Sequence, residues 1–455
     1  MNLKINFVFI VLALTTIVSR MAFADVVLFD KNDWKVSLNG FVEMDMFYDT
    51  TRSLIETAGN TPIARKGTEK GDSGRTQFSI RNSRFALGVY APETDGWKSK
   101  GYFEIDFLGY HPDPSIDGPT EASFFSNPTL RVRHAYMTAE KNGWKFIAGQ
   151  TWSLFGWQPD YVLASISVNP VTGTLYQRTQ KVGAMKNFSL NSSQVLQAAA
   201  ALERPTQRDG RIPNLEAGVR WLEQDRASGF NGPNSDIKNQ PLSIGLSGTY
   251  RNFSEPDVTS GSTDTQLNLP SYAFAVDTLI PILASSEKGQ VSNTLTLTGE
   301  FTMGKGYGDE MVGFTGGQHE TLAVNTTPGS NIDLDHGLGG YVNSAGTFEL
   351  LDLRTWNAEL QYHPDEKMFV TLGYGQLWSS NISDFVGAPV KTDAGMSTYA
   401  ASALYDRSEV KFMNVGYDCT SSLRVAGEFS QFTTQYVDGM ATHDNRYMLA
   451  SYFRF

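Results

Sequence analysis

The sequence predicts an all-β protein, a transmembrane antiparallel β-barrel of about 16 strands with a long loop folded into its lumen. Apolar and polar residues alternate over segments of about ten positions, as in strands that face lipid on one side and water on the other. The connections between these segments are alternately short and long, and the chain closes on an aromatic segment of the same kind. A large soluble β-sandwich or propeller would explain the alternation, but not these features together with an export signal.

The start of the chain has the parts of an export signal. Lys4 supplies the positive charge, residues 7–18 form a short apolar core, and residues 22–24 (Ala-Phe-Ala) fit the small-x-small cleavage pattern. An uncleaved membrane anchor is disfavoured because the apolar run is short for a spanning helix. We therefore expect a signal peptide over 1–24 and a single barrel domain over 25–455.

Composition narrows the classes of function. The formal net charge is -11, and removal of Lys4 and Arg20 with the signal peptide would make it more negative still. A nucleic-acid-binding protein usually leans basic, so no nucleic-acid partner is expected. Cys419 is the only cysteine, which excludes an intramolecular disulfide. An exported chain without disulfides needs another source of rigidity, and a closed sheet supplies it.

The first expected strand shows the alternation clearly. Val42, Met44 and Met46 share one face, whereas Glu43 and Asp45 share the other. The expected strands cover residues 34–48, 76–90, 98–109, 130–140, 143–151, 172–187, 194–203, 211–223, 241–252, 270–284, 291–303, 353–363, 367–378, 408–418, 422–434 and 445–455. An even number of strands is what bacterial barrels require.

The second expected strand changes phase near residues 82–83. Its apolar residues occupy even positions before this point and odd positions after it, as a β-bulge would produce. With a bulge, Arg81 and Arg84 both face the lumen. Without one, an arginine would meet lipid at a cost of about 2–4 kcal/mol near the bilayer midplane.

The third and fourth expected strands carry facing charges. Glu104 and Asp106 lie on the polar face of the third strand, and Arg131 and Arg133 lie on the polar face of the fourth. By the same parity His134 points outward, so we expect it at the membrane interface or at a subunit contact. The apolar face of the fourth strand is Leu130, Val132 and Tyr136.

The segment 152–171, which follows the fifth expected strand, is the candidate constriction loop. It is long and carries four aromatic residues, which is unusual for a solvated loop: Trp152, Phe155, Trp157 and Tyr161. We expect it to fold into the barrel and narrow the pore. The alternatives are packing across the outer rim or a subunit contact. The other long connections are expected at 49–75, 110–129, 253–269, 304–352 and 379–407, and short ones at 140–143, 364–367 and 420–421.

The later strands keep the alternation to the end of the chain. The sixth expected strand adds Arg178 and Lys181, whose parity is mixed. The last strand has Tyr447, Leu449 and Phe453 on one face, and it stops on an aromatic residue. Such an ending resembles the close of bacterial outer-membrane barrels, which places the chain in that membrane, in contact with its lipids.

A barrel of this size leaves an aqueous channel, so passive diffusion of small hydrophilic solutes is the expected function. Acids share the lumen parity with the arginines, and on neighbouring strands they would form ion pairs: Glu43, Asp45, Glu104, Asp106, Glu216, Glu300, Glu359 and Glu428. Two interpretations remain open. Paired arginines would only brace the wall of a general, non-selective or cation-leaning porin, whereas arginines left unpaired would bind anions.

A barrel-embedded enzyme or an adhesin is a more distant alternative. The six histidines are scattered, and the chain has neither a GxSxG nor an HExxH pattern. We therefore expect no enzymatic activity, no cofactor and no metal site.

Four segments, in this order and spacing, resemble the DcaP-like family of outer-membrane porins: 81–85 (RNSRF), 101–107 (GYFEIDF), 131–136 (RVRHAY) and 148–153 (AGQTWS). The resemblance is strongest from about residue 76 to residue 187. It implies a homotrimer of such barrels, each with an arginine-lined constriction that passes small anionic solutes such as dicarboxylic and aromatic acids. The residues it marks as pore-lining are Arg81, Arg84, Arg131, Arg133 and Arg178. Some members have a polar stretch after the signal peptide, which this chain does not share.

Overall fold

The computed structural model describes most of the chain after its first 25 residues. The described residues are 26–54, 56–59, 62–109, 129–166, 168–205, 212–232, 235, 237–256, 266–287, 289–311, 340–342, 348–387, 389–392 and 395–455. The predicted signal peptide, residues 1–24, lies outside them and stays a prediction.

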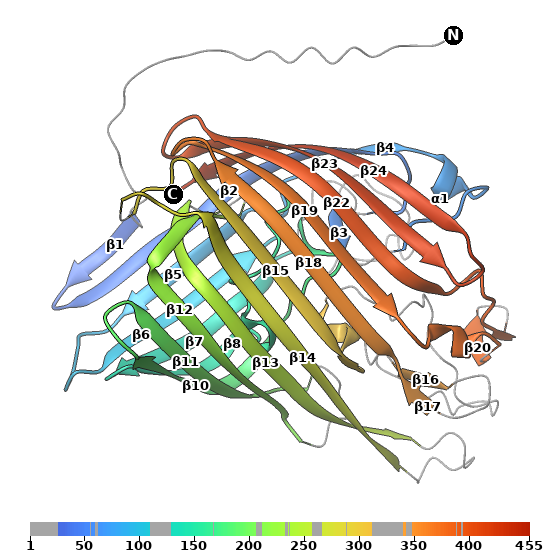
Figure 1. The fold of residues 1–455 in the computed structure, drawn as a ribbon, viewed down its shortest axis with the longest axis horizontal. Coiled ribbons are helices and arrows are strands. Elements are labelled where there is room, and N and C mark those ends of the chain that lie inside the picture. The colour runs from blue at the N-terminus through green and yellow to red at the C-terminus, as the bar shows by residue number, and fades with distance from the viewer. Residues whose placement is uncertain are drawn as a thin grey trace.

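The described residues form a closed antiparallel barrel of sixteen strands, as predicted (Figure 1). The barrel strands are β2 (Trp34–Asp49), β4 (Arg75–Ser79) continued by β5 (Arg84–Tyr90), β6 (Lys98–Asp106), β7 (Arg131–Lys141), β8 (Trp144–Trp152), β10 (Arg178–Ser189), β11 (Gln194–Glu203), β12 (Asn214–Phe230), β13 (Lys238–Pro256), β14 (Gln266–Leu283), β15 (Thr294–Lys305), β18 (Asp352–His363), β19 (Met368–Ser379), β22 (Tyr405–Asp418), β23 (Leu423–Tyr436) and β24 (Ala441–Arg454). Pairing of β24 with β2 closes the sheet, so the barrel has no free edge along its length.

Smaller elements lie at the two ends of the barrel. At one end β1 (Val26–Lys31) forms a hairpin with the start of β2. At the other end lie the long connections, with α1, β16, β17 and β20 on the right of Figure 1. The elements in the long connections are β3 (Thr57–Gly59), α1 (Glu69–Asp72), η1 (Phe155–Trp157), β9 (Val168–Val171), η2 (Gly308–Glu310), β16 (Gly340–Val342), β17 (Phe348–Leu350), η3 (Ile382–Phe385), β20 (Pro389–Thr392) and β21 (Gly395–Thr398). No helix in the described part of the chain is long and apolar enough to cross a membrane.

The outer surface of the barrel is apolar and the inner surface is polar. On β2, Val42 and Met44 are 47% and 41% exposed, whereas Glu43 and Asp45 between them are fully buried inside. The same alternation holds along β12 to β15 and β22 to β24. An apolar outer surface on a closed barrel requires a surrounding lipid phase. The predicted location in the bacterial outer membrane is therefore confirmed at the level of the fold.

The barrel wall is uneven in height. β6, β7, β8, β10 and β11 have 9 to 12 residues, whereas β12, β13 and β14 have 17 to 19. We call the first group the low wall. At about 3.3 Å per residue, the tallest strands rise more than 20 Å above the shortest ones. The arginines that the sequence singled out are all on or beside the low wall.

Candidate functional site

The connection from β8 to β10, residues 153–177, lies against the inner surface of the barrel. We call it the lumen loop. Its described residues contact inward-facing side chains of β12, β13, β15, β18, β22 and β23, strands from well-separated parts of the barrel. The loop therefore runs across the lumen from the low wall to the opposite side.

Glu216 anchors the start of the lumen loop. Its carboxylate accepts hydrogen bonds from the Ser153 hydroxyl at 2.8 and 2.9 Å, from the Leu154 amide at 2.8 Å and from the Phe155 amide at 2.9 Å. Glu216 and Ser153 are both fully buried. One carboxylate thus satisfies three donors of the tight turn at η1, which would otherwise be unpaired in the interior.

Three further glutamates hold the middle and the end of the loop. The carboxylates of Glu359, Glu428 and Glu300 accept hydrogen bonds from the amides of residues 164, 166 and 175 at 2.6, 2.6 and 3.1 Å. Each glutamate belongs to a different strand (β18, β23 and β15). Backbone amides bound to carboxylates form charge-assisted hydrogen bonds, which fix the path of the loop.

Apolar contacts complete the attachment of the loop. Trp157 and Tyr161 pack with Phe230 and Leu279 on the β12 to β14 side. The same loop carries Leu163 into a cluster with β22 and β23, and Ile166 into a cluster with β2 and β24. Burial of these side chains removes apolar surface from water and holds the loop inside the barrel.

These contacts change the interpretation of the lumen acids. Glu216, Glu300, Glu359 and Glu428 bind the lumen loop, and none of them forms an ion pair with an arginine among the described residues. The sequence had indicated that these acids pair with arginines of neighbouring strands. Their amide partners lie far away in the sequence and carry no side-chain signature, so the pattern of residues gave no sign of this role.

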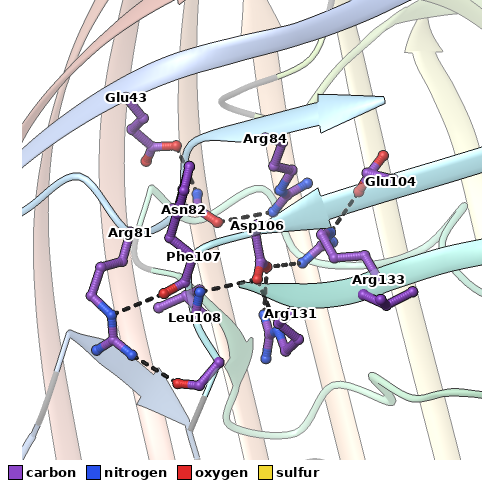
Figure 2. Close-up of polar contacts among 12 residues, drawn as sticks. Glu43, Arg81, Asn82, Arg84, Glu104, Asp106, Phe107, Leu108, Arg131 and Arg133 are labelled. Carbon is purple, nitrogen blue, oxygen red and sulfur yellow. Dashed lines mark hydrogen bonds and ion pairs between the residues drawn. The ribbon is translucent and has the colours of Figure 1, made fainter. Parts of the chain in front are cut away.

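The arginines gather on the low wall, where Arg133 and Arg131 are bound to carboxylates (Figure 2). The Arg133 guanidinium is 1% exposed and lies 2.5 Å from Glu104 and 3.0 Å from Asp106. Arg131 makes two hydrogen bonds to Asp106, at 3.0 and 2.6 Å, and remains one third exposed. This bidentate geometry is the strong form of the arginine–carboxylate pair.

Arg84 and Arg178 have no carboxylate partner among the described residues. Arg84 donates to the Asn82 side chain at 3.1 Å and lies 5.2 Å from the Phe41 ring (Figure 2 shows the Asn82 contact). Arg178 lies 4.7 Å from the Trp152 ring and 5.3 Å from the Tyr176 ring. Within the described chain, Nε of Arg84 and one terminal nitrogen of Arg178 are buried without any hydrogen-bond partner.

The local charge balance is positive. Four guanidinium groups, those of Arg84, Arg131, Arg133 and Arg178, face the two carboxylates of Glu104 and Asp106. We call these four arginines the arginine cluster. Two of the four guanidinium groups, those of Arg84 and Arg178, therefore have no carboxylate within ion-pair distance among the described residues, and the nearby Glu43 contacts Arg84 only through Asn82. Guanidinium groups with free donors and aromatic neighbours can bind a planar anion.

Three other predicted site residues lie outside this cluster. Arg81 is ion-paired with Glu56 in the first long connection, and it donates to the backbone oxygens of residues 107 and 109 at 3.1 Å (Figure 2). Glu43 accepts a hydrogen bond from the Asn82 side chain at 2.7 Å. Asp45 is fully buried beside it, and neither acid has an ion pair with an arginine among the described residues.

Two irregularities in strand pairing determine which side chains near the arginine cluster face the lumen. β2 pairs residue 45 with residue 79 and residue 41 with residue 84, so the second strand carries one extra residue between β4 and β5. This is the phase change predicted at residues 82–83. A second irregularity lies between β6 and β7, where Glu104 pairs with His134 but Ile105 pairs with residue 132.

The second irregularity makes the prediction for His134 wrong. Because Arg133 is the extra residue, His134 shares the inward face with Glu104, is 6% exposed and contacts the Thr151 hydroxyl at 3.1 Å. Tyr136 also turns inward, opposite Tyr102. Both Arg133 and His134 thus face inward, which strict alternation does not allow.

Solved structures with this fold are channels of bacterial outer membranes. The outer-membrane channel DcaP of Acinetobacter baumannii matches 94% of this chain and 99% of its own length, with a TM-score of 0.62 and 17% sequence identity. An anion-selective porin from Comamonas acidovorans matches 93% of this chain and 100% of its own length, with a TM-score of 0.54 and 10% identity. No family model and no curated protein sequence matches the chain. At these identities, the likeness establishes a shared porin fold.

Proposed function

We propose that this barrel is an outer-membrane pore for the passive diffusion of small hydrophilic solutes, with a preference for anions such as dicarboxylic or aromatic acids. The observation that carries the proposal is the excess positive charge of the arginine cluster. Arg84 and Arg178 lie next to aromatic rings, and neither is ion-paired with a carboxylate among the described residues. A carboxylate in the lumen supplies the missing counter-charge.

The lumen loop acts as the constriction in this proposal. Three of its glutamate anchors lie on β15, β18 and β23, away from the low wall, and the fourth, Glu216 on β12, lies beside β11 at its border. The loop thereby covers these acids and occupies their acceptor atoms, and it leaves the arginine cluster as the charged surface along the solute path. A chain with a net charge of -11 can in this way present a positive constriction.

We propose that the protein assembles as a homotrimer through the low wall, with the rest of its outer surface in contact with membrane lipids. Strands of 9 to 12 residues leave part of the outer circumference too low to match the tall side. Contact with two further copies would cover this side. Export by a cleaved signal peptide over residues 1–24 belongs to the same proposal, which includes no enzymatic activity.

The pairing of Arg131 and Arg133 supports a second candidate, a general porin with a braced wall. Both are tied to carboxylates, and Arg133 is almost fully buried. If every arginine only braces the wall, loss of Arg84 and Arg178 leaves the solute preference unchanged. The two candidates therefore differ in one measurable property.

Block of single channels by sodium succinate in planar bilayers tests the proposal. The double variant Arg84→Gln/Arg178→Gln is compared with wild type and with Arg226→Gln/Arg354→Gln, which removes two exposed arginines outside the cluster. We expect about a tenfold loss of succinate affinity in the first variant alone, since one charge-assisted hydrogen bond of about 1.5 kcal/mol corresponds to that factor. Equal block in all three proteins would favour the braced wall.

A further inference from the structure

A row of lysines and tyrosines continues the inward face of the low wall toward the end of the barrel that carries β1. On β5, Arg84 and Tyr90 share one face, whereas Leu87 and Val89 are exposed on the other. Tyr90 pairs with Lys35 of β2 on one side and with Lys100 of β6 on the other. The three side chains therefore form one row on the lumen side.

This row lies well apart from the arginine cluster. Six residues separate Arg84 from Tyr90 along β5, which corresponds to about 20 Å. The chain terminus and the short turns mark this end of the barrel as the periplasmic one. A solute that leaves the arginine cluster toward the periplasm meets this row next.

Neither ammonium group of the row is ion-paired within the described part of the chain, although Asp30 of β1 lies directly opposite Lys35 in the strand pairing. Nζ of Lys35 lies 5.8 Å from the Tyr90 ring, and Nζ of Lys100 lies 5.1 Å from the same ring and 4.7 Å from the Tyr102 ring. Among the described residues, neither lysine has a carboxylate within ion-pair distance or a hydrogen-bond partner. Two inward lysines nearby differ, since Lys98 and Lys145 are ion-paired with glutamates at 4.0 and 3.1 Å.

The rings hold the two charges apart at the lumen surface. A side chain at Gly88 would meet the Tyr90 ring at 3.1 Å, so the ring leans over Gly88 in the direction of Arg84. Lys35, Tyr90 and Lys100 are all partly exposed. The two ammonium groups can attract the carboxylate of a solute, while the carbon skeleton of the solute lies against the tyrosine ring between them.

We infer that Lys35, Tyr90 and Lys100 form a second station for small organic carboxylates at the periplasmic mouth of the pore. This inference rests on the proposed function, which needs only the arginine cluster. A lysine ammonium is a strongly hydrated point charge without the bidentate geometry of arginine. The station therefore raises the local concentration of the anion and releases it readily, as conduction through several weak sites requires.

Side-specific block by benzoate and by succinate tests the inference. Cys419, the only cysteine, is exposed in the periplasmic turn between β22 and β23. Biotin on this thiol, bound to streptavidin before insertion, keeps the periplasmic end on the side of addition and fixes the orientation of each channel. The variant Lys35→Gln/Lys100→Gln is compared with Lys141→Gln/Lys186→Gln, two lysines at the same height beside the outward-facing rings of Trp97 and Trp144.

In 0.1 M KCl we expect the association rate of block from the periplasmic side to fall about three- to tenfold in Lys35→Gln/Lys100→Gln. Block from the outer side and the behaviour of the control variant stay close to wild type. The difference shrinks in 1 M KCl, where the screening length is about 3 Å. A larger loss with benzoate than with succinate would reflect contact with the ring.

The possible failures are distinguishable. Wild-type block from the periplasmic side in Lys35→Gln/Lys100→Gln, together with reduced block in Arg84→Gln/Arg178→Gln, overturns the second station and leaves the proposed function standing. Absence of block by either anion in the wild-type channel overturns both. Heat-modifiable migration in SDS gels confirms that each variant is a folded barrel before it is recorded.

Discussion

Replacement of Glu216 by alanine tests the attachment of the lumen loop. The change removes the acceptor of three buried donors, the Ser153 hydroxyl and the amides of residues 154 and 155. The amides of residues 154 and 155 keep weaker second acceptors, the Glu203 carboxylate at 3.3 Å and the Ser153 hydroxyl at 3.2 Å. The main cost is therefore that of one buried donor left without a partner, and the attached loop loses about 1–3 kcal/mol. Water that enters the vacated space recovers part of this cost and moves the value toward the lower end.

This loss weakens the attachment of the start of the lumen loop, so the turn at η1 leaves the wall more often than in the wild type. We expect a higher mean conductance and frequent current transitions in single-channel recordings, and new protease cleavage between residues 153 and 166. The control is Glu223→Ala on the same strand, whose carboxylate accepts from the Gln194 side chain outside the loop contacts. Quiet current at wild-type conductance in folded Glu216→Ala protein would refute the anchoring role.

Three further predictions concern other parts of the molecule. Arg133→Gln takes an ion-pair partner from the carboxylates of Glu104 and Asp106 and should destabilise the barrel by about 3–5 kcal/mol. Heat-modifiable gels would show this as a lower conversion temperature. Arg131→Gln should have a smaller effect, because Arg131 is one third exposed. Gly156→Ala should reduce the stability of the attached lumen loop by at least about 1–2 kcal/mol. Gly156 has a φ of +73°, and a Cβ there would lie 2.6 Å from a leucine side chain. The rate of protease cleavage within the loop measures this loss of stability. Hydrogen bonds from Arg65 lower the pKa of Asp438. The contact between their two outer connections is therefore complete above the ordinary carboxyl pKa of about 4, and it is lost as pH falls through the lowered value. Proteolysis at pH 7 and at pH 3 measures this loss.

Matched variants separate these effects from general damage. Gly387→Ala also places alanine at a positive φ, of +85°, but no atom lies within 4 Å of its Cβ, so it should leave the lumen loop intact. Asp438→Asn should release the outer contact at pH 7 as acid does in the wild type. Equal cleavage of Asp438→Asn and wild type at pH 7 would contradict the assigned contact.

The sequence predicted the barrel well because lipid imposes one rule on every strand. Apolar outward residues mark both the strands and the phase change at residues 82–83, where the outward positions switch from even to odd. The irregularity at Arg133 left no such mark. Only one apolar residue, Val132, precedes it on β7, and Tyr136, which follows it, suits either face of a barrel wall.

The candidate site was predictable in part. The arginine positions came from parity and from the resemblance of four short segments, and the facing acids Glu104 and Asp106 came from adjacent strands. Which arginines lack a partner was not predictable, because it depends on side-chain reach in three dimensions. The attachment of Glu216, Glu359 and Glu428 to distant backbone amides was equally invisible, since every residue type supplies the same amide donor.

The reversal potential of wild-type channels under a KCl gradient, in planar bilayers, tests the central claim most directly. Two guanidinium groups without an ion pair among the described residues predict that chloride passes more readily than potassium, and that Arg84→Gln/Arg178→Gln reduces or abolishes this preference. A reversal potential on the cation side in the wild type, unchanged in the variant, would contradict the account.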